Sequence, residues 1–86
     1  ADRMGLHLGS LSRGFRQVFG VTPAAFRLVQ RSHRAVEAIL AGEASLSEVA
    51  LACGFADQAH MSRAVAALTD STPAALRRQA AMRAAA

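Results

Sequence analysis

Hydrophobic residues recur along this chain of 86 residues at the spacing of α-helices. Leu11, Phe15 and Phe19 fall at positions i, i+4 and i+8, which predicts a helix from about Gly9 to Phe19 with one apolar stripe. Gly20 is expected to end this helix in the left-handed conformation. No stretch of useful length alternates apolar and polar residues as a half-buried strand would. The pattern therefore predicts an all-α protein.

A longer helix is predicted over residues 23–41. Thr22 has the side chain of a good N-cap, and Pro23 suits the first turn because its missing N–H would have no partner there. Gly42 is expected to close the helix. Its apolar residues fall in two sets on different sides, so we expect contacts with neighbouring helices at both ends. This helix is therefore interpreted as a linker.

A short helix is predicted after the linker. Either Ser45 or Ser47 caps it together with Glu48, and Gly54 ends it. The glycine is followed by a tight turn. The next helix is thus expected to start only a few residues further along the chain.

That next helix is predicted over about 57–68. Asp57 is its expected N-cap, and Met61, Val65 and Leu68 form its buried stripe. A short helix, a glycine turn and a second amphipathic helix have the order and spacing of a helix-turn-helix motif. We therefore treat this helix as a candidate recognition helix.

A short phrase is repeated along the chain. Thr22-Pro23-Ala24-Ala25 returns fifty residues later as Thr72-Pro73-Ala74-Ala75, and Ser12-Arg13 returns at the same displacement as Ser62-Arg63. A helical unit used twice, each time with a serine-arginine pair, suggests paired reading of a periodic partner such as DNA. The second Thr-Pro phrase also predicts the start of a last helix.

The two units differ where the candidate recognition helix ends. Asp70 stands where the first unit has Gly20. Because aspartate tolerates left-handed geometry less well than glycine, the second turn is expected to be slightly strained or differently shaped.

Charge favours a polyanionic partner. All ten basic residues are arginine against six acids, which leaves a net charge of +4. No apolar run is long enough for a membrane span and no secretory signal is recognised, so a cytoplasmic, nucleoid-associated location is expected. Cys53 cannot form an internal disulfide and is interpreted as a buried structural residue.

Catalytic and metal chemistry find little support in the sequence. The three histidines and the single cysteine fit no zinc spacing, so neither a metal nor a cofactor is expected. No nucleophile-base pair, carboxylate pair or phosphate-cradling glycine loop stands out, and we expect no enzyme.

The candidate recognition helix carries a polar face opposite its apolar stripe. Gln58, Ala59, Ser62 and Arg63 occupy positions i, i+1, i+4 and i+5. In a major groove, arginine can bind guanine and glutamine can bind adenine with two hydrogen bonds each. The first unit offers a matching face with Gly9, Ser12, Arg13 and Arg16.

These residues resemble a known family. Gly54-Phe55-x-Asp57-Gln58-x-x-Met61-Ser62-Arg63, followed by Thr72-Pro73 and Arg77, is similar to the second helix-turn-helix of the AraC/XylS family of bacterial transcription regulators. Residues 5–19 resemble the end of the family's first helix-turn-helix, and residues 26–40 resemble its linker helix. Only residues 1–4 stand before Gly5, so the first motif is expected to be truncated in this chain.

The resemblance implies a homeodomain-like fold in which a linker helix joins two helix-turn-helix subdomains. Residues 1–22 would be the remainder of the first, 23–41 the linker, and 42–86 the second with a C-terminal helix. The two recognition helices would enter successive major grooves. The implied base-reading residues are Gly9, Ser12, Arg13, Gln58, Ala59, Ser62 and Arg63. Candidates for phosphate contacts are Arg16, Thr22, His60 and Thr72, with a solvated surface position as the alternative for His60.

The leading hypothesis is therefore sequence-specific binding of double-stranded DNA by a bacterial transcription regulator. RNA polymerase and an effector or dimerisation domain outside this chain are the further partners that the resemblance implies. The alternative is a helical bundle for protein interactions, a regulator fragment that has lost DNA binding.

Overall fold

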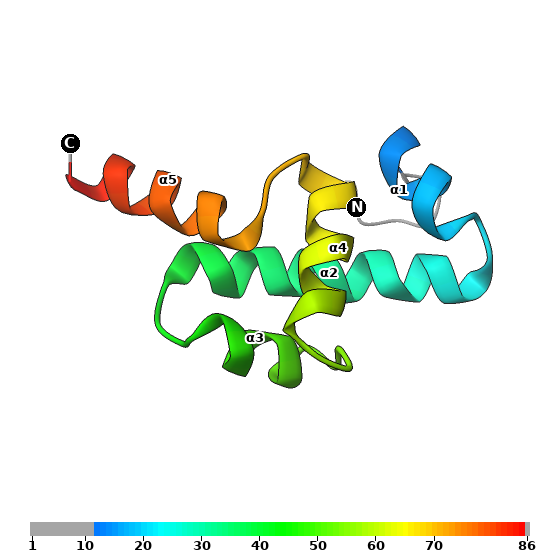
Figure 1. The fold of residues 1–86 in the computed structure, drawn as a ribbon, viewed down its shortest axis with the longest axis horizontal. Coiled ribbons are helices and arrows are strands. Elements are labelled where there is room, and N and C mark those ends of the chain that lie inside the picture. The colour runs from blue at the N-terminus through cyan, green and yellow to red at the C-terminus, as the bar shows by residue number, and fades with distance from the viewer. Residues whose placement is uncertain (1–11, 86) are drawn as a thin grey trace, which may run out of the picture.

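The computed structural model describes residues 12–85, and this part of the chain folds into α-helices without strands (Figure 1). The helices are α1 (Arg13–Phe19), α2 (Pro23–Ala41), α3 (Leu46–Ala52), α4 (Gln58–Thr69) and α5 (Pro73–Ala85). The all-α prediction is confirmed.

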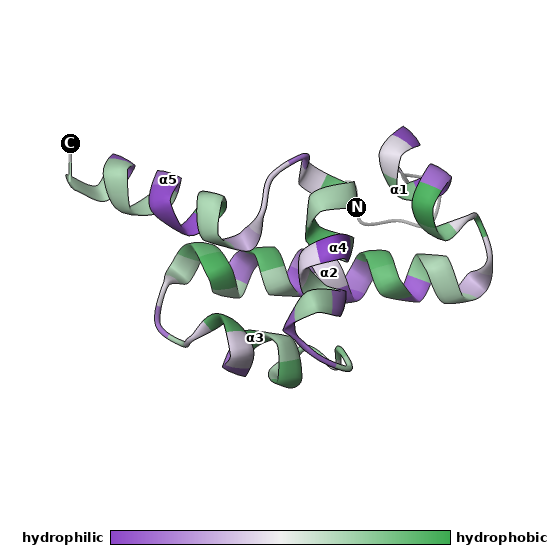
Figure 2. Ribbon diagram, viewed as in Figure 1, coloured by the Kyte–Doolittle hydropathy of each residue, from purple (hydrophilic) through white to green (hydrophobic). Residues whose placement is uncertain are grey.

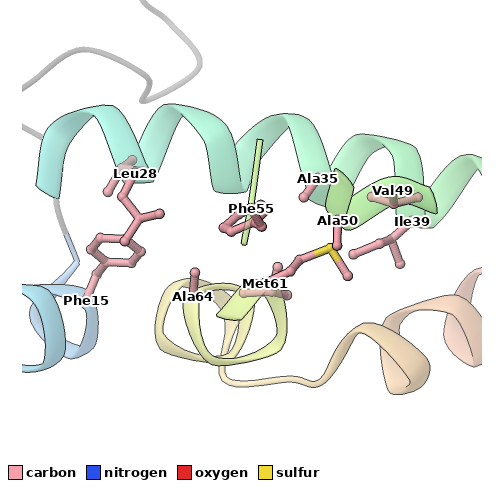
Figure 3. Packing of buried hydrophobic residues seen from close by; sticks show 11 residues of the cluster. Phe15, Leu28, Ala35, Ile39, Val49, Ala50, Phe55, Met61 and Ala64 are labelled. Carbon is pink, nitrogen blue, oxygen red and sulfur yellow. The ribbon is translucent and has the colours of Figure 1, made fainter. Parts of the chain in front are cut away.

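Helix α2 is the centre of the arrangement, and each of the other four helices packs against it. Its buried residues include Leu28 toward its start and Ile39 toward its end. In Figure 3, Phe15 of α1 lies at the Leu28 end and Val49 of α3 lies at the Ile39 end of one apolar cluster. The buried residues at both ends of α2 thus belong to one continuous core.

Local capping fixes the ends of α2 as the sequence predicts. The Thr22 hydroxyl accepts a hydrogen bond from the backbone N–H of Ala25 at 3.1 Å, and Pro23 is the first helical residue. Gly42 ends the helix in the left-handed conformation, with φ of 75°.

Ser45, rather than Ser47, caps α3. The Ser45 hydroxyl accepts from the Glu48 N–H at 3.1 Å, and the Glu48 carboxylate accepts from the Ser45 N–H at 2.9 Å. This reciprocal pair is a capping box, which satisfies two backbone donors at once. Ser47 therefore has no capping duty at this helix start.

Helix α1 begins at Arg13 and not near Gly9. Ser12 is extended, with ψ of 160°, and its hydroxyl accepts from the Phe15 N–H at 3.2 Å. Serine is among the best N-cap residues, and this local bond competes with continuation of the helix through Ser12. Gly9 lies outside the described residues.

Helix α1 packs directly against α4, and Gly14 permits the close approach. A Cβ atom at Gly14 would lie 3.1 Å from the backbone oxygen of Ala67. Phe15 is fully buried by this packing and its ring centroid lies 4.8 Å from that of Phe19. Glycine lowers the intrinsic stability of a helix, but at this position its lack of a side chain allows α1 and α4 to pack closely.

The two units end their helices differently, and the prediction of a left-handed cap at Gly20 is wrong, because Asp70 adopts that conformation and Gly20 does not. Asp70 is left-handed, with φ of 62° and ψ of 20°, whereas Gly20 has φ of 81° and ψ of −163°. The repeat is also uneven in burial. Val18 is 61% exposed although it corresponds to the half-buried Leu68.

Helix α5 lies along α2 without a continuous apolar stripe. Its strongly hydrophilic residues are Arg77, Arg78, Gln79 and Arg83, and in Figure 2 the purple segments of α5 alternate with alanine-rich turns. Arg77 is half-buried, and its Nε donates to the backbone oxygen of Ile39 at 3.1 Å. One terminal carbonyl of α2 is thereby satisfied from another helix.

Candidate nucleic-acid interface

Helix α4 has one buried side and one exposed side. Met61, Ala64 and Val65 are fully buried against the core. The opposite side carries the four residues predicted from the sequence, of which Ser62 is half-buried and Gln58, Ala59 and Arg63 are exposed. The structure therefore brings these four together on one surface.

The chemistry of this surface matches the edges of base pairs. Arg63 has a charged fork of donors that suits the two acceptors of guanine, and Ser62 can donate or accept. Ala59 presents only a methyl group, which can contact the methyl of thymine. The turn before α4 is fixed by Asp57, whose carboxylate accepts from the His60 N–H at 2.8 Å.

Gln58 is joined to the preceding helix. The Ser47 hydroxyl donates to the Gln58 carboxamide oxygen at 3.1 Å, and both residues are exposed. Sequence reasoning treated Ser47 only as a possible cap. The sequence does contain a hint of this contact. Only one of the two serines can cap α3, so the hydroxyl of the second serine is free to bind another residue.

His60 is held against the turn of the motif. Its ring lies edge-on to Phe55, with centroids 5.2 Å apart and planes at 88°. The residue is half-buried, so the structure places it beside the exposed face and not on it. A phosphate contact by His60 stays a prediction.

Arg31 of α2 also contacts this turn, which the sequence reading did not foresee. Its guanidinium carbon lies 5.9 Å from the centre of the Phe55 ring. A Cβ atom at Gly54 would lie 3.2 Å from the Arg31 Nε. The arginine thus covers the glycine turn and is not simply a member of a solvated helix face.

The first unit presents fewer free groups than predicted. The Ser12 hydroxyl is used as a cap, although it retains a hydrogen to donate. Arg13 and Arg16 are exposed. Gly9, the remaining predicted base reader of this unit, lies outside the described residues.

The contact between α1 and α4 also limits the distance between the two candidate readers. Because Gly14 lies close to Ala67, and Ala67 is nine helical steps from Gln58, the Cα atoms of Arg13 and Gln58 lie within about 25 Å. One turn of DNA spans ~34 Å. Insertion of the two recognition helices into successive major grooves stays a prediction.

Thr22 and Thr72 stand at the starts of α2 and α5 and are exposed. Each hydroxyl accepts a backbone N–H, from Ala25 and from Ala75, at 3.1 Å. Each keeps one hydroxyl hydrogen, and the N-terminus of a helix favours an anion. Their use as phosphate contacts stays a prediction.

Within residues 12–85, no group of three or more histidine, cysteine or acidic side chains is placed to hold a metal ion. No helix in the same stretch combines the length and apolar character needed to cross a membrane. Cys53, expected to be buried, is only partly so, at the edge of the core.

Comparison with known proteins adds one result. A family model described as a helix-turn-helix domain matches residues 1–79. Searches of curated proteins and of solved structures each gave no match. The match covers both repeated units and includes all of the exposed face of α4.

Proposed function

The chain belongs to the AraC/XylS family of helix-turn-helix DNA-binding domains, and from this premise we propose that it binds double-stranded DNA sequence-specifically as part of a bacterial transcription regulator. The observation that carries the proposal is the two-sided character of α4. Its apolar side is fully buried while its polar side is exposed. A helix presented in this way can enter a major groove without disturbing the core.

Within that groove, we assign base edges to Gln58, Ala59, Ser62 and Arg63. Arg63 carries the largest share, because a bidentate arginine-guanine pair discriminates against a wrong base by about 1–3 kcal/mol. Ala59 contributes only a methyl contact. The net charge of +4 supplies a sequence-independent attraction for the phosphates.

The first unit has a secondary role in this proposal. Arg13 and Arg16 are exposed on α1, and Arg16 is assigned to phosphates. Gly9, Ser12 and Arg13 are assigned to the bases of the adjacent major groove, which a duplex that bends toward the protein would bring nearer. Thr22, Thr72 and His60 are assigned to phosphates.

The proposal extends to the setting of the domain. The helix-turn-helix family is typically non-enzymatic, and we propose a binding role without catalysis. RNA polymerase, an effector or dimerisation domain, and a location on the nucleoid are part of the same proposal.

The test compares Arg63→Ala with a matched control. A duplex is first selected from a random-sequence pool with the wild-type chain, and affinities are then measured by fluorescence anisotropy at several salt concentrations. Arg63→Ala should weaken binding by about 1–3 kcal/mol and relax preference at one base pair. Arg83→Ala removes the same charge from the last turn of α5 and should leave base preference unchanged.

Equal binding by wild type and Arg63→Ala, without dependence on salt, would reject groove reading by α4. Failure of the wild-type chain to bind any duplex even at low salt would favour the alternative, a helical bundle that binds another protein.

A further inference from the structure

A hydrogen bond on the surface joins the two helices of the helix-turn-helix. The Ser47 hydroxyl donates to the Gln58 carboxamide oxygen at 3.1 Å. Ser47 is the second residue of α3, and Gln58 is the first residue of α4. Neither side chain caps its helix, because Ser45 and Asp57 do so. The bond therefore has no evident use in ending or starting a helix.

The bond matters because the two ends of a carboxamide have opposite hydrogen-bonding character. The oxygen only accepts and the nitrogen only donates. A glutamine that reads adenine uses both ends at once, accepting from the N6 amino group and donating to N7. Guanine presents two acceptors, N7 and O6, and needs only the donor end.

We propose that Ser47 is a positioning residue that holds the Gln58 oxygen and turns its amide nitrogen toward DNA. This inference rests on the proposed function. It makes Gln58 a donor, so the base pair that Gln58 contacts favours guanine over adenine. The usual pairing of glutamine with adenine places both ends of the carboxamide on the base edge, and it is disfavoured because an oxygen held toward Ser47 is turned away from that edge.

The bond also orders Gln58 before DNA arrives. A free glutamine on a surface samples many rotamers and loses that freedom when it binds. A side chain already held in one orientation loses less, which favours the base edge that fits this orientation. An exposed hydrogen bond between neutral groups adds little to folding, so removal of Ser47 should alter base preference much more than stability.

Four variants of the full chain test the proposal by selection from a random pool of double-stranded DNA. Gln58→Ala identifies the base pair that depends on Gln58, as the position at which the wild-type preference disappears. Ser47→Ala should reduce the guanine-to-adenine ratio at that position by about tenfold, the scale of one base-edge contact. Ser47→Thr keeps the hydroxyl and should retain the wild-type ratio.

Ser45→Ala is the structural control. It removes the cap of α3 without touching Gln58, so it should lower the melting temperature and leave the base ratio unchanged. Selected preferences are then checked by anisotropy on two duplexes that differ only at the identified base pair.

The outcomes separate this inference from the proposed function. If the wild-type chain enriches no sequence, the proposed function fails. If it enriches a sequence and Ser47→Ala selects the same bases, or if the Gln58-dependent position favours adenine, the inference is overturned while DNA binding stands. A Gln58→Ala profile identical to wild type would also overturn it, because Gln58 would then read no base.

Discussion

The Arg31 guanidinium lies over the face of Phe55, with 5.9 Å between the guanidinium carbon and the ring centre. His60 meets the same ring edge-on at 5.2 Å. Arg31 comes from the linker helix α2, Phe55 from the turn, and His60 from α4. The orientation of the candidate recognition helix is thus tied to the linker through one aromatic ring.

Replacement of Arg31 by methionine should lower stability. Methionine keeps much of the apolar stem of arginine and removes its charge. The decrease in the free energy of unfolding therefore measures the cation–π contact, worth about 0.5–1 kcal/mol at an exposed site. Urea denaturation followed by circular dichroism measures it. Arg27→Met is the matched control, because Arg27 is an exposed arginine on the same helix. Equal losses for the two variants would contradict a specific role for Arg31.

Gly54 should tolerate a side chain less well than Gly42, although both have positive φ, of 87° and 75°. A Cβ at Gly42 meets nothing within 4 Å, so Gly42→Ala measures the backbone cost alone, about 1–2 kcal/mol. A Cβ at Gly54 would crowd the Arg31 Nε at 3.2 Å and displace it from Phe55. We therefore expect Gly54→Ala to cost about 0.5–1 kcal/mol more.

Combining Gly54→Ala with Arg31→Ala tests whether the extra cost at Gly54 comes from the Arg31 side chain. In an Arg31→Ala background the crowding atoms are absent, so Gly54→Ala and Gly42→Ala should cost the same. Denaturant unfolding of all combinations provides the comparison. An excess that persists without the Arg31 side chain would show that the two residues are not coupled.

Much of this fold could be predicted because its helix boundaries are set by local chemistry. Thr22 with Pro23, Gly42, and Asp57 each act on backbone groups within four residues. These capping residues lie next to the helix ends in the sequence, and their effect does not depend on the rest of the fold. The exposed face of α4 followed from helical periodicity in the same way.

The features that could not be predicted depend on contacts between distant residues. Gly14 lowers helix propensity, and only the approach of Ala67 shows its use. Nothing in the sequence distinguishes Arg31 from the other arginines of α2, and its contact with Phe55 depends on the fold. Ser12 corresponds to Ser62 in the repeat. However, Ser12 is the N-cap of α1, whereas Ser62 lies in the middle of α4. Sequence similarity between repeats therefore did not fix similar geometry.

Replacement of Asp70 by glycine should stabilise the protein by about 0.5–1 kcal/mol. Asp70 is left-handed at the C-terminal end of α4, where glycine avoids the steric cost and where a negative charge is unfavourable to the helix dipole. Thermal unfolding should show a higher melting temperature, since 1 kcal/mol corresponds to about 4–8 °C in a domain of this size.

Two further variants separate the causes at Asp70. Asp70→Asn removes the charge and keeps a residue that tolerates the left-handed region, so it should give part of the gain. Asp70→Ala removes the charge but keeps the steric cost. If alanine stabilised as much as glycine, backbone geometry would not be the source of the effect.

Acidification below pH 6.5 should destabilise the protein through His33. Desolvation by burial lowers the pKa of His33 below the 6.5 of an unperturbed histidine, and the negative charge of Glu37 only partly offsets this. The unfolded chain then binds more protons than the folded one just below pH 6.5, so stability falls as the pH decreases through this window. Urea unfolding between pH 7.5 and about 5.5, above the range in which carboxylates titrate, measures the slope. His33→Gln should flatten it, and Glu37→Gln should steepen it because the opposing charge is removed. A slope that is the same in wild type and His33→Gln would show that another group controls this transition.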